Sequence, residues 1–244
     1  MRSTVELVAE LAAGRDGAGA RTVVRRARAG GHFAVRETAP GVVHLVGTAA
    51  GPLGGDEVEV RIRVGAGARL AVRSVAATLV YPARDVATSA VRVVAEVADG
   101  GHLDLAPEPT IVCAGADLTA TTRVALAGSA TLRLLEEVVL GRANEPPGRW
   151  RGRTVVTRDG VPLLSHTLRS DVLSDARRAG PVEPARAVVT LLEVDAARSA
   201  AAAQPRVRGN AVALPLAAPG AILTTAFGRD LAAVRADVAA ATYA

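Results

Sequence analysis

GPLGGDEVEVRIRVGAGARLAVRSVAA, residues 51–77, is the stretch that decides the fold. From residue 57 to residue 64 apolar and charged side chains alternate strictly, which is typical of a β-strand with one buried face. The glycine-rich segment 65–68 allows a tight reversal, because glycine accepts positive φ, and a second alternating run follows at Leu70 and Val72. The stretch therefore predicts two consecutive strands joined by a sharp turn.

The same pattern recurs along the chain. The leading apolar residues of four such units lie 37, 33 and 29 residues apart, and they are Phe33, Leu70, Leu103 and Leu132. Because one strand pair cannot bury its apolar face alone, we expect the units to stack. The predicted fold class is all-β, with stacked β-sheets of β-helix or solenoid-like type or a sandwich, and a few short helices. The drifting spacing argues against a strict solenoid.

The remaining elements follow from the same periodicities. Further strands are expected at residues 5–11, 21–26, 32–37, 42–48, 153–157, 161–168, 187–194, 212–216 and 221–226. The first of these also fits a short helix, and the turn Arg158-Asp159-Gly160 predicts a hairpin. Residues 174–179 and 196–204 each fit a short helix or an irregular segment. Apolar residues at helical spacing predict a C-terminal helix over residues 230–241.

Length and composition favour a single domain over residues 1–244, because no stretch resembles a flexible linker. Half of the residues are hydrophobic but only 2% are aromatic, so Val, Leu and Ala must build the core. A single cysteine, Cys113, excludes an internal disulfide and fits a reducing cytoplasm. Acids interrupt the apolar N-terminal segment, and we expect neither a secretory signal nor a membrane span.

The net charge of +5 and the pI of about 10.7 invite a nucleic-acid interpretation. Because the arginines are scattered and few aromatic side chains exist to stack on bases, we do not expect nucleic acid to be the partner. A basic β-scaffold that binds nucleic acid nevertheless stays as the alternative function. The chain contains no lysine, which excludes a phosphate-binding loop and Schiff-base chemistry.

The sequence contains no pattern typical of a catalytic site. Ser129 lies in a turn, and the four histidines lack metal-ligand spacing. His32 and His102 occupy the same place in two repeat units, which favours repeated turn geometry over ligation. Cys113 lies in an apolar run and is interpreted as a small buried hydrophobe. An enzyme, such as an unrecognised hydrolase, has only the acidic residues in its favour, so we expect a protein that is not an enzyme.

Two acidic positions are informative. Asp56 follows two glycines at the entrance to a strand, and Glu136-Glu137 interrupts an apolar strand at residues 132–140. Alternation places one glutamate of the pair on the buried face, where an unpaired carboxylate is costly. The structural interpretation gives it a partner such as Arg142. The functional interpretation is an acid that lines a polar passage and holds a cation briefly.

Four motifs in this chain resemble the urease accessory protein D family, also called UreD or UreH. They are Gly-Gly-Asp at 54–56, Ala-Ala-Thr-Leu-Val-Tyr at 76–81, Pro-Glu-Pro-Thr at 107–110 and Leu-Gly-Arg at 140–142. The resemblance runs in order from about residue 22 to residue 168. It implies an all-β stack of sheets and a non-catalytic scaffold that binds apo-urease in the cytoplasm.

The resemblance also implies partners and a route for a metal. Members of the family act with UreF and the GTPase UreG to deliver nickel to the urease active site. A water-filled passage through such proteins is thought to carry the metal, and Asp56, Thr78 and Glu136 match positions assigned to it. We therefore expect no tightly bound cofactor, only nickel in transit.

Overall fold

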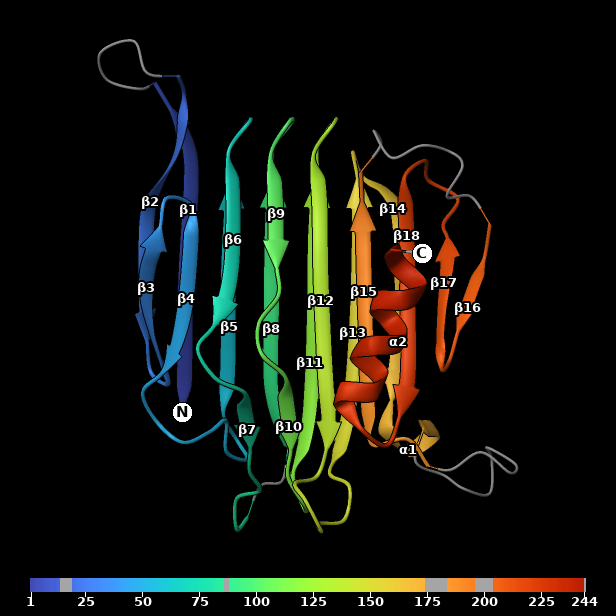
Figure 1. Ribbon diagram of the computed structural model, residues 1–244. Coiled ribbons are helices and arrows are strands. Elements are labelled where there is room, and N and C mark those ends of the chain that lie inside the picture. The colour runs from blue at the N-terminus through green and yellow to red at the C-terminus, as the bar shows by residue number, and fades with distance from the viewer. Residues whose placement is uncertain (14–18, 86–87, 174–183, 196–203, 244) are drawn as a thin grey trace.

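Two β-sheets packed face to face form the body of the molecule, as the computed structural model shows (Figure 1). The structure describes residues 1–13, 19–85, 88–173, 184–195 and 204–243. The smaller sheet has seven strands in the order β14 (Val161–Arg169), β13 (Arg149–Arg158), β11 (Asp117–Leu126), β8 (Thr88–Val97), β5 (Glu57–Val64), β1 (Arg2–Ala12) and β2 (Arg21–Gly30).

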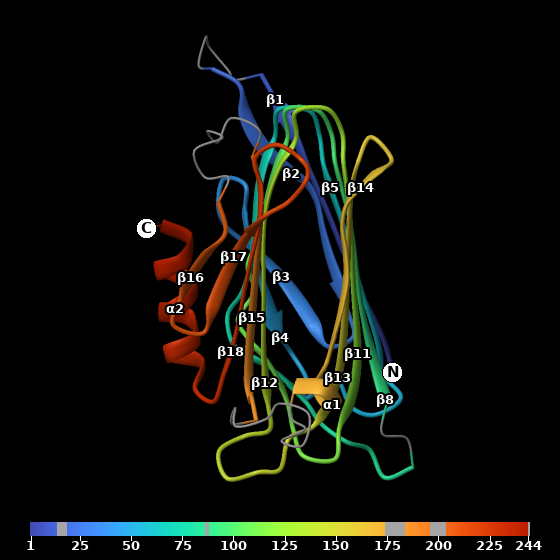
Figure 2. The same cartoon turned by 90° about the vertical axis from the view of Figure 1, so that its right-hand side faces the viewer.

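The larger sheet has eleven strands. Its main path is β16 (Arg206–Arg208), β17 (Ala211–Pro215), β18 (Ala221–Gly228), β15 (Ala187–Val194), β12 (Thr131–Leu140), β9 (His102–Leu105), β6 (Arg69–Ser74), β4 (Val42–Gly47) and β3 (Phe33–Ala39). Two short strands lie off this path. β10 (Thr110–Val112) pairs with β12, and β7 (Thr78–Val80) pairs with β10. Seen edge-on, the two sheets form two stacked layers. Helix α2 (Leu231–Tyr243) covers the outer face of the larger sheet (Figure 2).

Successive strand pairs form stacked coils, which confirms the solenoid-like prediction. β5 leads through a glycine turn into β6, β8 into β9, and β11 into β12, and equivalent strands of neighbouring coils pair in parallel. Leu103 lies opposite Leu70 on one side and opposite Leu132 on the other. The spacings of 33 and 29 residues therefore measure one coil each.

The first predicted unit is wrong. Phe33 does not join the ladder of Leu70, because β3 pairs antiparallel with β4, and it is β4 that pairs in parallel with β6. His32 and His102 are consequently not equivalent. His32 contacts Asp56, just before β5, whereas His102 begins β9 beyond the turn that follows β8, at the other end of the coils. Alternation alone cannot distinguish a parallel partner from an antiparallel one, which is why the sequence misassigned this edge.

Apolar side chains fill the space between the sheets and also the space beneath α2. Leu7, Ile62 and Leu103 belong to the larger of two clusters between the sheets, and Leu140 and Trp150 belong to the other. A third cluster joins α2 to the outer face of the larger sheet. Because β15 has apolar neighbours on both faces, all eight of its residues are buried, as its mostly apolar run predicts.

Most predicted elements are confirmed. The expected strand at residues 5–11 is β1 and not a helix, and the predicted hairpin is β13 and β14. The predicted C-terminal helix is α2, whose first turn is capped by Asp230 Oδ1, which accepts a hydrogen bond from Ala233 N at 2.9 Å. A further helix, α1, is a single turn (Ser170–Leu173). Residues 174–179 and 196–203 lie outside the described part of the chain.

Candidate functional site

Asp56 is buried at the entrance to β5 and makes a compact set of contacts. Its Oδ2 accepts a hydrogen bond from Leu53 N at 2.8 Å and lies 3.1 Å from His32 Nε2, while Oδ1 contacts the amino group of Met1. Burial raises the pKa of this carboxyl, but the Met1, Leu53 and His32 contacts outweigh that effect and hold the pKa below its ordinary value. Asp56 is therefore an ionised group that fixes the turn entering β5.

Ser3, His32 and Asp56 form a chain of contacts that superficially matches a hydrolase triad. His32 Nδ1 lies 2.6 Å from Ser3 Oγ, and Ser3 Oγ also accepts a hydrogen bond from His32 N at 3.0 Å. The order is the reverse of a triad, in which the serine contacts Nε2 and the carboxylate contacts Nδ1. Ser3 is 0% exposed, so no substrate can reach its hydroxyl. This arrangement orients Asp56 and does not activate Ser3.

Thr78 lies where two hollows adjoin. One is a space of about 160 Å³ between the sheets, and the other, of about 290 Å³, opens beside His32 and Gly51. Both are lined by Phe33, Leu45, Ser74 and Thr78. At about 30 Å³ per molecule, the inner space has room for about five waters. Thr78 thus lines both hollows, and the outer one is also lined by His32, which contacts Asp56.

Glu136 points into the inner space from β12 and bridges two threonines of the opposite sheet. Its Oε1 accepts a hydrogen bond from Thr122 Oγ1 and its Oε2 accepts one from Thr154 Oγ1, both at 2.7 Å. Among the described residues, no arginine lies within ion-pair distance of this carboxylate. The small residue Ala120, at the next inward position of β11, lines the space beside it, whereas the indole of Trp150 covers Gly152. The hydroxyls, and not a cation, solvate this acid.

Glu136, Thr122 and Thr154 belong to a row of polar side chains that crosses the core. Register places His166 next to Thr154 on the smaller sheet, and Thr190 and then Thr225 next to Glu136 on the larger sheet. We call this row the polar belt, and its members are Thr122, Thr154, His166, Glu136, Thr190 and Thr225. The belt separates the two apolar clusters between the sheets, because the inward neighbours on its two sides belong to different clusters.

His166 is the titratable neighbour of Glu136 in the polar belt. Burial lowers the pKa of its imidazole below the ordinary value, and the negative charge of Glu136 offsets only part of that effect. The ring is therefore neutral near pH 7. A neutral imidazole nitrogen is a metal ligand as well as a hydrogen-bonding group.

Glu137 faces the other way, toward α2. Arg235 donates to both of its carboxylate oxygens, with Nε at 2.8 Å and Nη2 at 2.5 Å. Arg142, the partner expected for this acidic pair, instead contacts Glu145 and lies over the ring of Tyr81. The Arg142 expectation is wrong, because the chain turns at Gly141, where φ is +83°.

Sequence reasoning missed most of the polar belt. It identified Glu136 but not the threonines or His166, because threonine is an ordinary strand residue and carries no signal alone. The available signal was the alternation of side chains along each strand. Thr122, Thr154 and Thr190 all fall at inward positions of otherwise apolar faces. Asp56, Thr78 and Glu136 do not converge on one point. In the described part of the chain, no three His, Cys, Asp or Glu side chains gather as a metal site.

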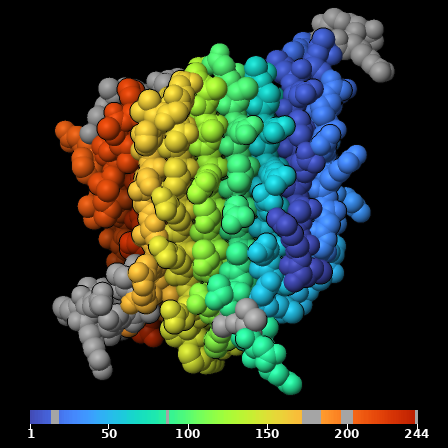
Figure 3. Space-filling view, turned by 180° about the vertical axis from the view of Figure 1, so that it is seen from behind, coloured from blue at the N-terminus to red at the C-terminus, as the bar shows by residue number. Residues whose placement is uncertain are grey.

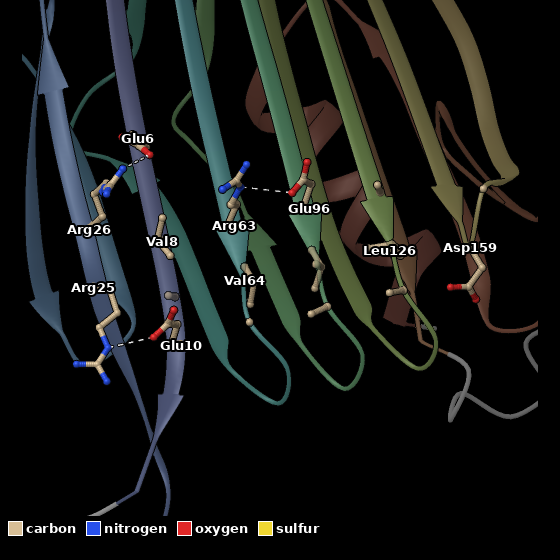
Figure 4. A pocket seen from close by; sticks show the side chains of 17 residues that line it. Glu6, Val8, Glu10, Arg25, Arg26, Arg63, Val64, Glu96, Leu126 and Asp159 are labelled. Carbon is tan, nitrogen blue, oxygen red and sulfur yellow. Dashed lines mark hydrogen bonds and ion pairs between the residues drawn. The ribbon is translucent and has the colours of Figure 1, made fainter.

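A third hollow lies on the exposed face of the smaller sheet (Figure 4). It measures about 770 Å³ and is lined by charged residues that form pairs. Glu6 pairs with Arg26 at 2.6 Å, Glu10 with Arg25 at 3.2 Å, and Glu96 with Arg63 at 3.4 Å. Because these charges neutralise one another, the hollow offers little unsatisfied chemistry to a ligand.

Comparison with known proteins gives a consistent result. A profile of the UreD urease accessory protein family matches residues 7–243. Urease accessory protein UreD of Frankia alni is 41% identical over 210 residues, which cover 79% of this chain and 70% of that protein. The Streptomyces coelicolor protein of the same name is 40% identical over 227 residues, 90% of this chain and 89% of its own.

A third relative is the UreD protein of Frankia casuarinae, which is 39% identical over 212 residues. The match covers 75% of this chain and 65% of that protein, so the chain spans just under two thirds of this relative's length. None of the helices described here combines the length and the apolar character that crossing a bilayer requires.

Proposed function

The chain belongs to the UreD urease accessory protein family, and from that premise we propose that it is a non-catalytic maturation factor for urease. It binds apo-urease in the cytoplasm and enables nickel delivery into the urease active site together with UreF and the GTPase UreG. The observation that carries the proposal is the family match over residues 7–243, which extends through both sheets and α2. The chain has no lysine for a phosphate-binding loop, so the GTPase must be a separate protein.

The inner space and the polar belt support a route for the metal. Thr78 lines both hollows, and Glu136 lines the inner one, where it carries a negative charge without a described cationic partner. Nickel is the cargo of this route and not a resident cofactor. Hydroxyl, water and carboxylate oxygens bind a divalent cation more weakly than a set of imidazoles or thiolates, which suits release at the far end.

Asp56 has a different part in this proposal. Its carboxylate is occupied by Leu53 N and His32, so it acts on the outer hollow only indirectly, by holding His32, which lines that hollow. Glu136 is the residue with free capacity, because each carboxylate oxygen has two lone pairs and accepts one described hydrogen bond. Replacing Glu136 therefore tests the proposed passage more directly than replacing Asp56 or Thr78.

The test measures nickel per urease active site in cells that produce variants of this chain. The double replacement Asp56→Ala and Glu136→Ala should lower the nickel content while the complex with apo-urease still assembles. Glu136→Gln alone keeps the size and one acceptor oxygen but removes the charge, and should lower nickel loading as well. Glu137→Gln is the matched control, because the same change is made one residue along, on the face toward α2. Equal nickel loading with Glu136→Gln and Glu137→Gln would remove the passage from the proposal.

A further inference from the structure

The outer face of the smaller sheet is a broad, open surface. Seen from behind, its strands lie side by side from β14 and β13 through β11, β8 and β5 to β1, and no described helix or strand crosses over them (Figure 3). Along each of these strands the inward residues are buried and the outward residues are mostly charged or small. The surface is also rigid, because its central strands are paired on both sides.

Charge is distributed unevenly over this face. On the half formed by β2, β1 and β5, most arginines meet glutamates, as in the pairs of Arg26 with Glu6 and Arg61 with Glu59, and Arg28 is an exception among the described residues. On the half formed by β8, β11 and β13, four exposed arginines have no carboxylate within ion-pair distance among the described residues, and they are Arg92, Arg123, Arg151 and Arg153. We call these four residues the arginine cluster.

Register brings the cluster together. Arg92 on β8 and Arg153 on β13 lie on either side of Thr121 of β11, so two strand spacings, about 10 Å, separate their Cα atoms. Arg123 and Arg151 each lie two residues from this row on the same face, a displacement of about 7 Å. Four like charges at such separations repel one another, and an anionic partner relieves that repulsion.

We propose that the arginine cluster is a docking surface for an acidic patch of a partner protein. The proposal rests on the proposed function, in which the chain is a scaffold that grips apo-urease. The guanidinium group forms bidentate contacts with carboxylates, and arginine is enriched in protein interfaces. The residues between and beside the arginines are small or apolar, namely Thr119, Thr121, Val94 and Val155, and leave room for close approach.

The composition of this face favours a protein over a nucleic acid. No aromatic side chain faces outward from β8, β11 or β13, because Trp150 points inward and is buried. Stacking on bases is therefore absent from the surface. Two carboxylates, Glu96 and Asp117, flank the cluster, and each is already paired with an arginine, Arg63 and Arg149 respectively.

The test compares two double charge reversals with equal change in net charge. The first is Arg123→Glu with Arg153→Glu in the cluster. The control is Arg28→Glu with Arg36→Glu, which are exposed arginines on β2 and β3 at the opposite edge of the molecule. Binding of the full chain to purified apo-urease, and separately to a 20-base-pair DNA duplex, is measured at two salt concentrations.

The cluster variant should lose at least about tenfold in affinity for apo-urease, and the control should stay within about twofold of wild type. Wild-type affinity should also fall at higher salt. Equal affinities of the two variants overturn the docking surface while the proposed function stands. Loss of DNA binding alone in the cluster variant, with apo-urease binding kept, assigns the face to nucleic acid and also overturns it. A wild-type chain that does not bind apo-urease overturns both proposals.

Discussion

Replacing Leu103 by alanine should cost the fold about 3–5 kcal/mol. The Leu103 side chain is 0% exposed and lies between Leu70 and Leu132 in the parallel ladder of β6, β9 and β12. Leucine-to-alanine changes in cores cost about 2–5 kcal/mol, and less where the surroundings collapse into the cavity. Here both neighbouring backbones are fixed by ladder hydrogen bonds, so we expect little collapse and a cost in the upper part of that range.

Urea unfolding followed by circular dichroism measures this cost as the change in the free energy of unfolding. The slope with urea should be unchanged, since both proteins expose the same surface on unfolding. Leu214→Ala is the control, because Leu214 is 43% exposed on β17, and its cost should stay below about 1 kcal/mol. A Leu103→Ala cost no larger than that of Leu214→Ala would refute the stacked-coil account.

Two further predictions concern charged groups. Arg235→Ala should lower the free energy of unfolding by about 1–3 kcal/mol, because it leaves Glu137, whose side chain is 3% exposed, without its ion-pair partner. Adding Glu137→Gln should recover part of this loss in the same urea titration; no recovery contradicts the pairing. Since burial lowers the pKa of His166, the unfolded chain binds a proton first as pH falls, and stability decreases below about pH 6.5. His166→Gln should flatten this decrease, leaving the part due to His102, whose pKa burial also lowers; an unchanged pH dependence refutes the assignment.

The stacked strands were predictable because their signals are local. Strict alternation at residues 57–64 and a glycine turn determine a strand pair from a dozen residues, and its recurrence predicts stacking. The antiparallel placement of β3 was not predictable in this way, because it depends on which partner an edge strand meets. Arg235, which pairs with Glu137 from 98 residues away, was invisible for the same reason.

The candidate site was predictable only in part. Alternation correctly predicted that one glutamate of Glu136-Glu137 faces the interior. Both acids are tolerated because each face of β12 supplies a partner, Thr154 for Glu136 and Arg235 for Glu137. The rest of the polar belt comes from β11, β13, β14, β15 and β18, and only the register of those strands aligns its members. A single polar residue in an apolar strand is a weak signal, whereas several at matching positions of stacked coils form a strong one.

We propose that this chain lets urease acquire nickel. The most direct measurement is the nickel content of urease purified from host cells that lack the gene, compared with the same cells supplied with the wild-type chain. We expect nearly metal-free urease in the first case and full loading in the second. Fully loaded urease in cells without the chain would contradict the account.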